Sequence, residues 1–192
     1  YPESLLDGLV AILTRHRENT GRIVHIISDE PYANLLFGGR KIPSILARYP
    51  HAWVIRSHSK DLGLAGERIG YLVHGPAMAG PDTLGALRNS ARALGFVNAP
   101  ALMQRVVPLA YNARVPVGRY EERVSAFVSI LREAHFSVVR PDGGFFVFPS
   151  SPIADDRVFC EKMIAHGVLC VPGSGFGSPG HFRVSLTQPL DR

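Results

Sequence analysis

The sequence has little cysteine and no cysteine or histidine cluster. Of its 192 residues only Cys160 and Cys170 are cysteines, and neither belongs to a Cys-x-x-Cys pair or to a His/Cys group with zinc spacing. We therefore predict no metal site. Two cysteines can form one disulfide, or they can stay as two buried thiols in a reducing compartment. The second interpretation goes with a cytoplasmic protein, which is the localisation that we expect.

Long apolar runs and runs of like charge are also missing. No stretch approaches the roughly 20 apolar residues of a membrane-spanning helix, and no signal-peptide pattern is visible. The formal net charge is +5, but Lys and Arg are scattered singly along the chain. Scattered positive charge favours solubility and small anionic ligands over nucleic acid. We expect neither a membrane nor a nucleic-acid partner, and the hydrophobic content of 46% indicates a globular protein.

In residues 1–115, predicted helices alternate with predicted strands. Leucine and isoleucine recur at helical spacing over residues 4–17, and Gly21 is a plausible end for that helix. Apolar, β-branched runs predict strands at 22–28, 51–57 and 66–76. Helices are predicted at 44–50, 81–94 and 100–112. The alternation predicts an α/β domain with part of a mostly parallel, doubly wound sheet.

Residues 116–192 follow a different pattern. A long amphipathic helix is predicted at 117–135, and a hairpin-like pair of strands is predicted at 136–150 around Asp142, Gly143 and Gly144. A helix at 154–166 and strands at 167–173 and 181–187 complete the chain. We therefore predict a second, smaller α+β domain with antiparallel strands.

Polar residues follow two of the predicted strands. The strand at 22–28 runs into Ser28-Asp29-Glu30-Pro31-Tyr32, and the strand at 51–57 runs into Ser57-His58-Ser59-Lys60. Ligands bind open parallel sheets beyond the carboxyl ends of the strands. If these two strands are parallel, an acid, a phenol, hydroxyls and an amine surround one crevice.

A lysine beside hydroxyls and a carboxylate suggests imine chemistry with a carbonyl cofactor. Pyridoxal phosphate needs an amine for its aldehyde, an anion for its ring nitrogen and a hydrogen-bond donor for its ring oxygen. Lys60, Asp29 and Tyr32 have the required groups. Taken singly, each residue has a plainer explanation: a solvated lysine, a turn-capping acid and a core tyrosine. Their combination in order is what favours a site.

The cofactor phosphate needs hydroxyls and a guanidinium. Ser57, Ser59 and Arg68 have these groups, and the glycines at 63, 66 and 70 allow close backbone approach.

Several segments together resemble one known family. "SDEPYANLLF" (28–37), "SHSKDLGLAGERIGYLV" (57–73) and "GVLCVPGSGFGSPGHFRVSL" (167–186) are similar to segments of the class I/II aminotransferases, which are fold-type I pyridoxal-phosphate enzymes. "NAPALMQ" (98–104) and "PDGGFFVF" (141–148) are similar to family segments as well. The resemblance implies Lys60 as the lysine that forms a Schiff base with the cofactor, Asp29 as the partner of the pyridine nitrogen and Tyr32 as the donor to the ring oxygen. It also implies Ser57 and Arg68 as phosphate ligands, with Ser59 as an additional candidate, and Arg183 as the partner of the substrate carboxylate.

The resemblance implies transfer of an amino group between an amino acid and a 2-keto acid in a homodimer. It begins partway through the family pattern, so we expect the C-terminal half of an aminotransferase, with residues 1–115 from the cofactor-binding large domain and 116–192 forming the small domain. The family's first half adds a phosphate-binding loop, an aromatic residue over the ring and an asparagine. Two alternatives stay open: a lyase or cyclising enzyme of the same fold, and a non-catalytic fragment that acts as a binding or assembly module.

Overall fold

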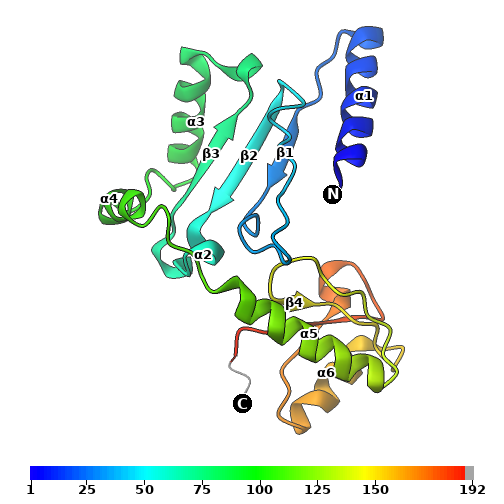
Figure 1. Cartoon of the computed structure of the whole chain (residues 1–192). Helices are drawn as coiled ribbons and strands as arrows, with labels where there is room; N and C mark the ends of the chain where they lie inside the picture. Colours follow the sequence, from blue (N-terminus) through cyan, green and yellow to red (C-terminus); the bar gives the residue numbers. More distant parts are fainter. Residues whose placement is uncertain (189–192) are drawn as a thin grey trace. The chain divides into compact units, whose positions relative to one another are not determined.

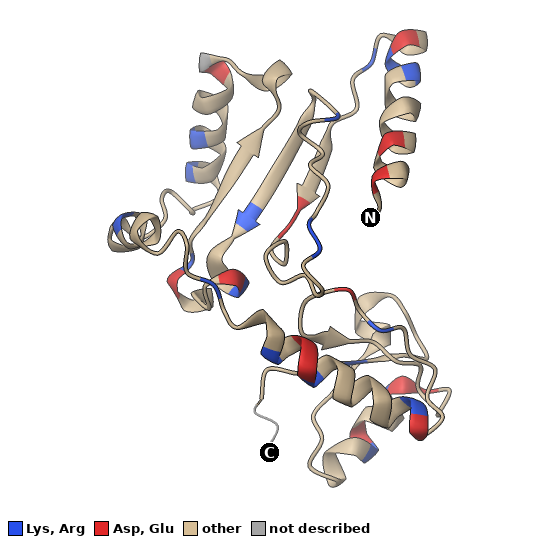
Figure 2. Cartoon of the chain, viewed as in Figure 1, with Lys and Arg blue, Asp and Glu red and all other residues tan. Residues whose placement is uncertain are grey.

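The computed structural model describes residues 1–188, except for the side chain of Pro81, and the chain divides into two compact units (Figure 1). The first unit comprises Tyr1–Asn34 and Arg40–Val115, and the second comprises Leu35–Gly39 and Pro116–Arg192. Each unit is described by itself. Charged residues of both signs are spread over both units (Figure 2).

The first helix, α1 (Glu3–Thr20), confirms the helix predicted from apolar spacing. Glu3 lies in its first turn and Arg17 in its last, so each charge complements the helix dipole. Gly21 ends the helix in the left-handed conformation, with φ of 69°, and its N–H bonds to the carbonyl of Arg17.

The sheet of the first unit has the strand order β1-β2-β3. β1 (Ile26–Asp29) and β2 (Ala52–Ser57) pair in parallel, as the sequence predicts. β3 (Gly70–His74) pairs with β2 in the antiparallel direction. One face of the sheet packs against α1. The α1 side chains in this contact are Leu6, Val10 and Leu13. They lie against a buried cluster formed by β2 and the turn before it, which consists of Ile45, Tyr49, Ala52 and Val54.

Three predicted elements of this unit differ from the structure. The strand predicted at 66–76 is limited to Gly70–His74, and Ala65–Glu67 form a 3₁₀ turn instead. The strand predicted at 22–28 begins only at Ile26. The helix predicted at 44–50 is wrong, because the segment forms a single turn in which the N–H groups of Arg48 and Tyr49 both bond to the carbonyl of Ile45. The segment between Pro43 and Pro50 is too short to propagate a helix beyond its first turn. The Tyr49 hydroxyl donates to the carbonyl of Val24 at 2.7 Å, which holds this turn in the core.

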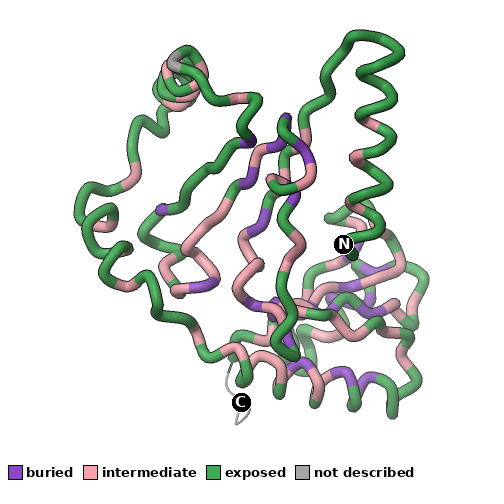
Figure 3. Tube along the Cα trace, turned by 45° about the horizontal axis from the view of Figure 1, so that its top comes forward, coloured by how far each residue is buried: buried purple, intermediate pink, exposed green. Residues whose placement is uncertain are grey.

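Short helices connect the strands and follow them. α2 (His58–Asp61) and the 3₁₀ turn η1 (Ala65–Glu67) lie between β2 and β3, and η2 (Pro76–Met78) follows β3. The predicted helices at 81–94 and 100–112 are confirmed as α3 (Pro81–Ala93) and α4 (Ala101–Leu109). Residues of this region are largely exposed (Figure 3). The exposed apolar side chains include Leu84, Leu94, Phe96, Leu102 and Leu109.

The second unit is an α+β lobe. The long predicted helix is α5 (Val117–Glu133), and α6 (Asp156–Ala165) follows it. β4 (Phe146–Val147), β6 (Phe182–Ser185) and β5 (Val171–Pro172) form an antiparallel sheet in that order, and the 3₁₀ turn η3 (Gly173–Phe176) follows β5. The core is built from α5, α6 and the sheet, with Phe37, Val124, Val128, Val147, Phe159, Phe182 and Val184.

The hairpin predicted at 136–150 is wrong. β4 pairs with β6 rather than with residues before Asp142, and Gly143 forms a bridge with Leu36. A Cβ at Gly143 would lie 2.6 Å from the carbonyl oxygen of Leu35, so the close approach of the two backbones requires glycine. The segment 136–150 therefore pairs with segments far away in the sequence instead of folding back on itself as a hairpin.

Both cysteines are free thiols in the structure, with Cys160 buried and Cys170 half-buried. Cys160 Sγ and Cys170 Sγ lie 3.3 Å apart. Burial, together with the hydrogen bond between the two thiols, raises the pKa of Cys160 to about 12.

No helix within the described part of the chain is long and apolar enough to cross a membrane. Residues 1–188 also contain no group of three or more His, Cys, Asp or Glu side chains that could hold a metal ion.

Gly70 tests the packing of β2 against β3. A Cβ at this position would lie 2.4 Å from the carbonyl oxygen of Arg56, where the strands leave no room. We expect Gly70→Ala to lower the free energy of unfolding by about 1–3 kcal/mol, the usual cost of overpacking. Gly66→Ala is the matched control, since nothing lies within 4 Å of its added Cβ. Urea unfolding followed by the fluorescence of Trp53, the single tryptophan, measures both variants. Equal effects of the two substitutions would contradict this account.

Asp156 gives the second unit an acid-sensitive contact. Its carboxylate accepts hydrogen bonds from the N–H groups of Ser174 at 2.8 Å and Gly180 at 3.1 Å, and only 3% of the residue is exposed. Burial disfavours the charged form, but these hydrogen bonds outweigh burial, so the pKa of Asp156 lies below its usual value of 3.8.

Because the pKa of Asp156 is depressed in the folded state, its contribution is full above pH 3.8 and is lost as pH falls through the lowered pKa. Asp156→Asn should lower the melting temperature at neutral pH and make its decline below pH 3.8 shallower than in the wild type. Circular dichroism melts over a pH series measure this effect, with the exposed Glu161→Gln on the same helix as control. If the melting temperature of Asp156→Asn fell below pH 3.8 as steeply as that of the wild type, the Asp156 carboxylate would not be the source of the acid sensitivity.

Candidate active site

The parallel pairing of β1 and β2 brings two of the predicted site residues to one edge of the sheet. Asp29 lies opposite Ile55 in the register, and Ser57 follows two residues later on the same face. Asp29 is exposed and Ser57 is half-buried. A carboxylate and a hydroxyl therefore share the face and the edge where the two strands end.

Lys60 is the third residue of α2, a single helical turn that begins directly after β2. Ser57 caps this turn, because its Oγ accepts a hydrogen bond from the N–H of Ser59 at 3.1 Å. The Ser57 hydroxyl also donates to Ser59 Oγ at 2.8 Å. The two hydroxyls thus lie together at the start of the turn that carries the half-buried Lys60.

Arg68 follows η1 and lies two residues before Gly70, the register partner of Ser57. Its backbone is left-handed, with φ of 50° and ψ of 46°, which is uncommon for a residue other than glycine. The exposed guanidinium donates to the carbonyl of Ala65 at 2.9 Å.

Tyr32 lies in the turn 31–34 after β1 and is half-buried. This turn is tied to α2 by a hydrogen bond from Asn34 Nδ2 to Asp61 Oδ2 at 2.9 Å. Because Asn34 is two residues from Tyr32 and Asp61 is adjacent to Lys60, one side-chain contact links the segments that carry both predicted site residues.

Asp61 is a residue that the sequence reasoning missed. It is only 7% exposed, and its carboxylate accepts from Asn34 and contacts His58 Nδ1 at 3.3 Å. Its main-chain carbonyl also accepts from the N–H of Val115 at 3.0 Å. A buried carboxylate needs such partners. The sequence does not show that the Asp61 side chain is buried. Its position directly after Lys60 was the one feature of the sequence that indicated a role near the predicted site.

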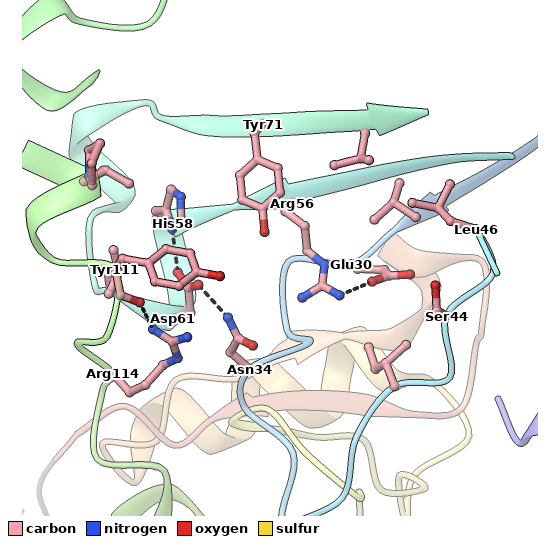
Figure 4. A pocket seen from close by; sticks show the side chains of 16 residues that line it. Glu30, Asn34, Ser44, Leu46, Arg56, His58, Asp61, Tyr71, Tyr111 and Arg114 are labelled. Carbon is pink, nitrogen blue, oxygen red and sulfur yellow. Dashed lines mark hydrogen bonds and ion pairs between the residues drawn. The ribbon is translucent and has the colours of Figure 1, made fainter. Parts of the chain in front are cut away.

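A cavity of about 510 Å³ lies on the face of the sheet that carries Arg56 and Tyr71 (Figure 4). In its wall Arg56 bonds to Glu30 at 2.7 Å, and His58 and Asn34 bond to Asp61. Arg114, which also lines the cavity, donates to the main-chain carbonyls of Tyr111 and Ala113. None of the predicted site residues lines this cavity. Asp29 lines a second cavity of about 460 Å³ beside α1, and Glu30 and Ile42 line both cavities. Strand alternation places Arg56 and Ser57 on opposite faces of the sheet.

Arg183 belongs to the second unit. It lies in β6, with Phe182 and Val184 on either side pointing into the core, so its own side chain points outward. Its Cζ lies 4.4 Å from the ring centroid of Phe146 and 4.2 Å from that of Phe176. These are cation–π distances.

Comparison with known proteins gives a consistent result. The model of the family "Aminotransferase class I and II" matches residues 6–191. Aspartate aminotransferase from Bacillus subtilis is 31% identical over 211 residues, covering 100% of this chain and 50% of that protein. Histidinol-phosphate aminotransferase 2 from Haemophilus influenzae is 30% identical over 177 residues, covering 86% of this chain and 44% of that protein. The crystal structure of an aminotransferase from Eubacterium rectale superposes with a TM-score of 0.90 at 33% identity, covering 100% of this chain and 48% of that chain.

The fold is that of part of a fold-type I aminotransferase. It belongs to the class I and II aminotransferase family, whose cofactor is pyridoxal 5'-phosphate. The chain spans about half the length of the curated relatives that it matches.

The residues at this sheet edge fit the cofactor by the chemistry of their donor groups. Asp29 is an exposed carboxylate, Ser57 and Ser59 are paired hydroxyls at a helix start, and Arg68 is an exposed guanidinium with a single hydrogen bond to a carbonyl. An anionic phosphate is favoured by hydroxyls and a guanidinium, and a protonated ring nitrogen is favoured by a carboxylate.

Asp61 tests the link between the turn 31–34 and α2. Asp61→Ala leaves the side chains of Asn34 and His58 without their acceptor, and we expect the free energy of unfolding to fall by about 1–3 kcal/mol. Trp53 fluorescence in urea measures the change, with the exposed Glu67→Ala as control. The exchanged pair Asn34→Asp with Asp61→Asn should recover part of the loss, since a carboxylate and an amide again face each other. A loss no larger than that of Glu67→Ala would contradict the assignment.

Proposed function

We propose that this chain carries the lysine-bearing half of a pyridoxal-phosphate aminotransferase site, which moves an amino group between an amino acid and a 2-keto acid. The observation that carries the proposal is the parallel pair β1–β2. It brings Asp29 to the same edge and face of the sheet as Ser57, which caps the helical turn that carries Lys60. Family membership supports the reaction class.

In this proposal each strand-end residue holds one part of the cofactor. Lys60 would hold the aldehyde carbon through Nζ, Asp29 would keep the ring nitrogen protonated, and the Tyr32 phenol would donate to the ring oxygen. The phosphate is held by the hydroxyls of Ser57 and Ser59 and by the Arg68 guanidinium. When bound, the cofactor supplies an electron sink for the carbanion formed at the substrate Cα.

Lys60 and Arg183 act on the substrate. The carboxylate of the amino acid is held by the Arg183 guanidinium. Once the amino group of the substrate has displaced Lys60 from the cofactor, the freed amine of Lys60 would take the proton from Cα and later return a proton, as general base and then as general acid.

The proposal applies to the assembled protein. Residues 1–115 correspond to part of the cofactor-binding large domain, and 116–192 to the small domain. Because the matched relatives are about twice as long, the proposed site needs residues beyond those of this chain. The exposed apolar side chains of α3 and α4 suit burial against further protein, which supports a homodimer.

A non-catalytic binding or assembly module is the second candidate. The observation that favours it is that the two cavities described above do not enclose Lys60, Ser57 or Arg68.

Incubation with pyridoxal phosphate and reduction with borohydride separate the two candidates. We expect a visible absorption band and, after reduction, a covalent adduct on the peptide that contains Lys60, because an amine beside phosphate-binding groups captures the aldehyde. The chain has three lysines, so Lys41→Ala and Lys162→Ala are matched controls that should keep the adduct, whereas Lys60→Ala should lose it. An adduct spread over all three lysines, or none at high cofactor concentration, would favour the non-catalytic module. Formation of a keto acid without ammonia then identifies transfer rather than elimination.

A further inference from the structure

The guanidinium of Arg183 lies among aromatic rings on the outer face of the second unit's sheet. Phe146 and Phe176 lie within cation–π distance of its Cζ, at 4.4 and 4.2 Å. Phe148 packs edge-on against Phe176 with 6.2 Å between ring centroids, and it stacks on His181 at 5.4 Å. We call Phe146, Phe148, Phe176 and His181 the aromatic patch.

Arg183 is half-buried, yet within the described residues its guanidinium makes no hydrogen bond and no ion pair with protein groups. An arginine presents five N–H donors in a planar fork. Here the rings contact the guanidinium while its donors stay available to a ligand. A structural ion pair would have used those donors, so the arrangement suits capture of an external anion.

Both rings are held in place by the fold. Phe146 pairs with Ser185 across the β4–β6 ladder, so it is a diagonal neighbour of Arg183 on the same face. Phe176 ends η3, which is closed by the hydrogen bond from the N–H of Ser178 to the carbonyl of Gly173 at 3.0 Å. The buried Asp156 carboxylate bonds to the N–H groups of Ser174 and Gly180, on either side of Phe176.

We propose that Phe146 and Phe176 are positioning residues for Arg183: their rings hold the guanidinium in one orientation with its N–H donors directed to a substrate carboxylate. Arginine otherwise loses considerable side-chain freedom on binding. Rings that orient the guanidinium beforehand reduce that loss, so carboxylate binding becomes tighter without a new hydrogen bond. That Arg183 binds a substrate carboxylate rests on the function proposed above. That the two rings orient the Arg183 guanidinium does not depend on that function.

The orientation is tested by NMR on the chain itself. Ring currents should shift the Arg183 Nε–Hε resonance upfield of the other arginines, and Arg183→Lys assigns the signal by removing it. Phe146→Leu and Phe176→Leu should return the resonance toward the common position, while Phe176→Tyr should keep it shifted. Phe148→Leu is the matched control, since this ring contacts Phe176 and His181 but makes no cation–π contact with Arg183 within the described structure.

The effect on binding has two readouts. Titration with acetate at constant ionic strength should move the Arg183 signal, and the apparent affinity should fall about three- to tenfold in Phe176→Leu, the size of a modest cation–π contribution. In the assembled holoenzyme the same substitution should raise KM for the amino acid by a similar factor, with kcat changed little, and Phe176→Tyr should restore KM.

The outcomes separate this proposal from the proposed function. An Arg183 resonance that is unshifted, or unchanged in both leucine variants, overturns the positioning role whatever the activity. A shifted resonance with unchanged acetate affinity in Phe176→Leu also overturns it. An inactive wild-type holoenzyme overturns the aminotransferase function and leaves the NMR and acetate measurements to decide the role of the two rings.

Discussion

The parallel pairing of β1 with β2 is the constraint on which the rest of the first unit depends. It places the turn that carries Tyr32 and the helical turn that carries Lys60 at one edge of the sheet. Strand alternation then sorts the side chains, so that Arg56 faces the larger cavity while Asp29 and Ser57 face the other side. A slip of one residue would exchange these faces and separate the carboxylate from the hydroxyl pair. The buried cluster around Ala52 and Val54 opposes such a slip, because it would expose apolar side chains.

Buried polar contacts fix the positions of loops that the hydrogen bonds of the sheet do not reach. The Glu30–Arg56 ion pair joins the ends of the two strands, and Asp61 joins the turn after β1 to α2. Buried ion pairs add little net stability, because desolvation offsets their attraction. Their effect here is geometric: each fixes one loop relative to a neighbour. Asp156 does the same in the second unit, where it holds the loop that carries Phe176. In both units a buried carboxylate outside the predicted site fixes a loop close to one of the predicted site residues.

The success of prediction from sequence depended on the range of the interactions. α1 and α5 were predictable because apolar spacing and end residues are local properties. β2 was predictable because a short β-branched run suits a buried strand. The turn at 44–50 was mistaken for a helix because its geometry depends on Tyr49 entering the core. The hairpin around Gly143 failed because β4 pairs with β6, some 35 residues later in the chain, and Gly143 pairs with Leu36, far earlier.

The sequence by itself determined the chemistry available to this protein. The order and spacing of Asp29, Tyr32, Ser57, Lys60 and Arg68 indicated the cofactor family, because the reactive groups and their local spacing are written in the chain. Only the tertiary structure decided which strands pair, which faces Asp29 and Arg56 occupy, how deeply Asp61 is buried and which rings surround Arg183. The physical reason is that such juxtapositions arise from packing between segments far apart in sequence, where burial and backbone pairing override local preference.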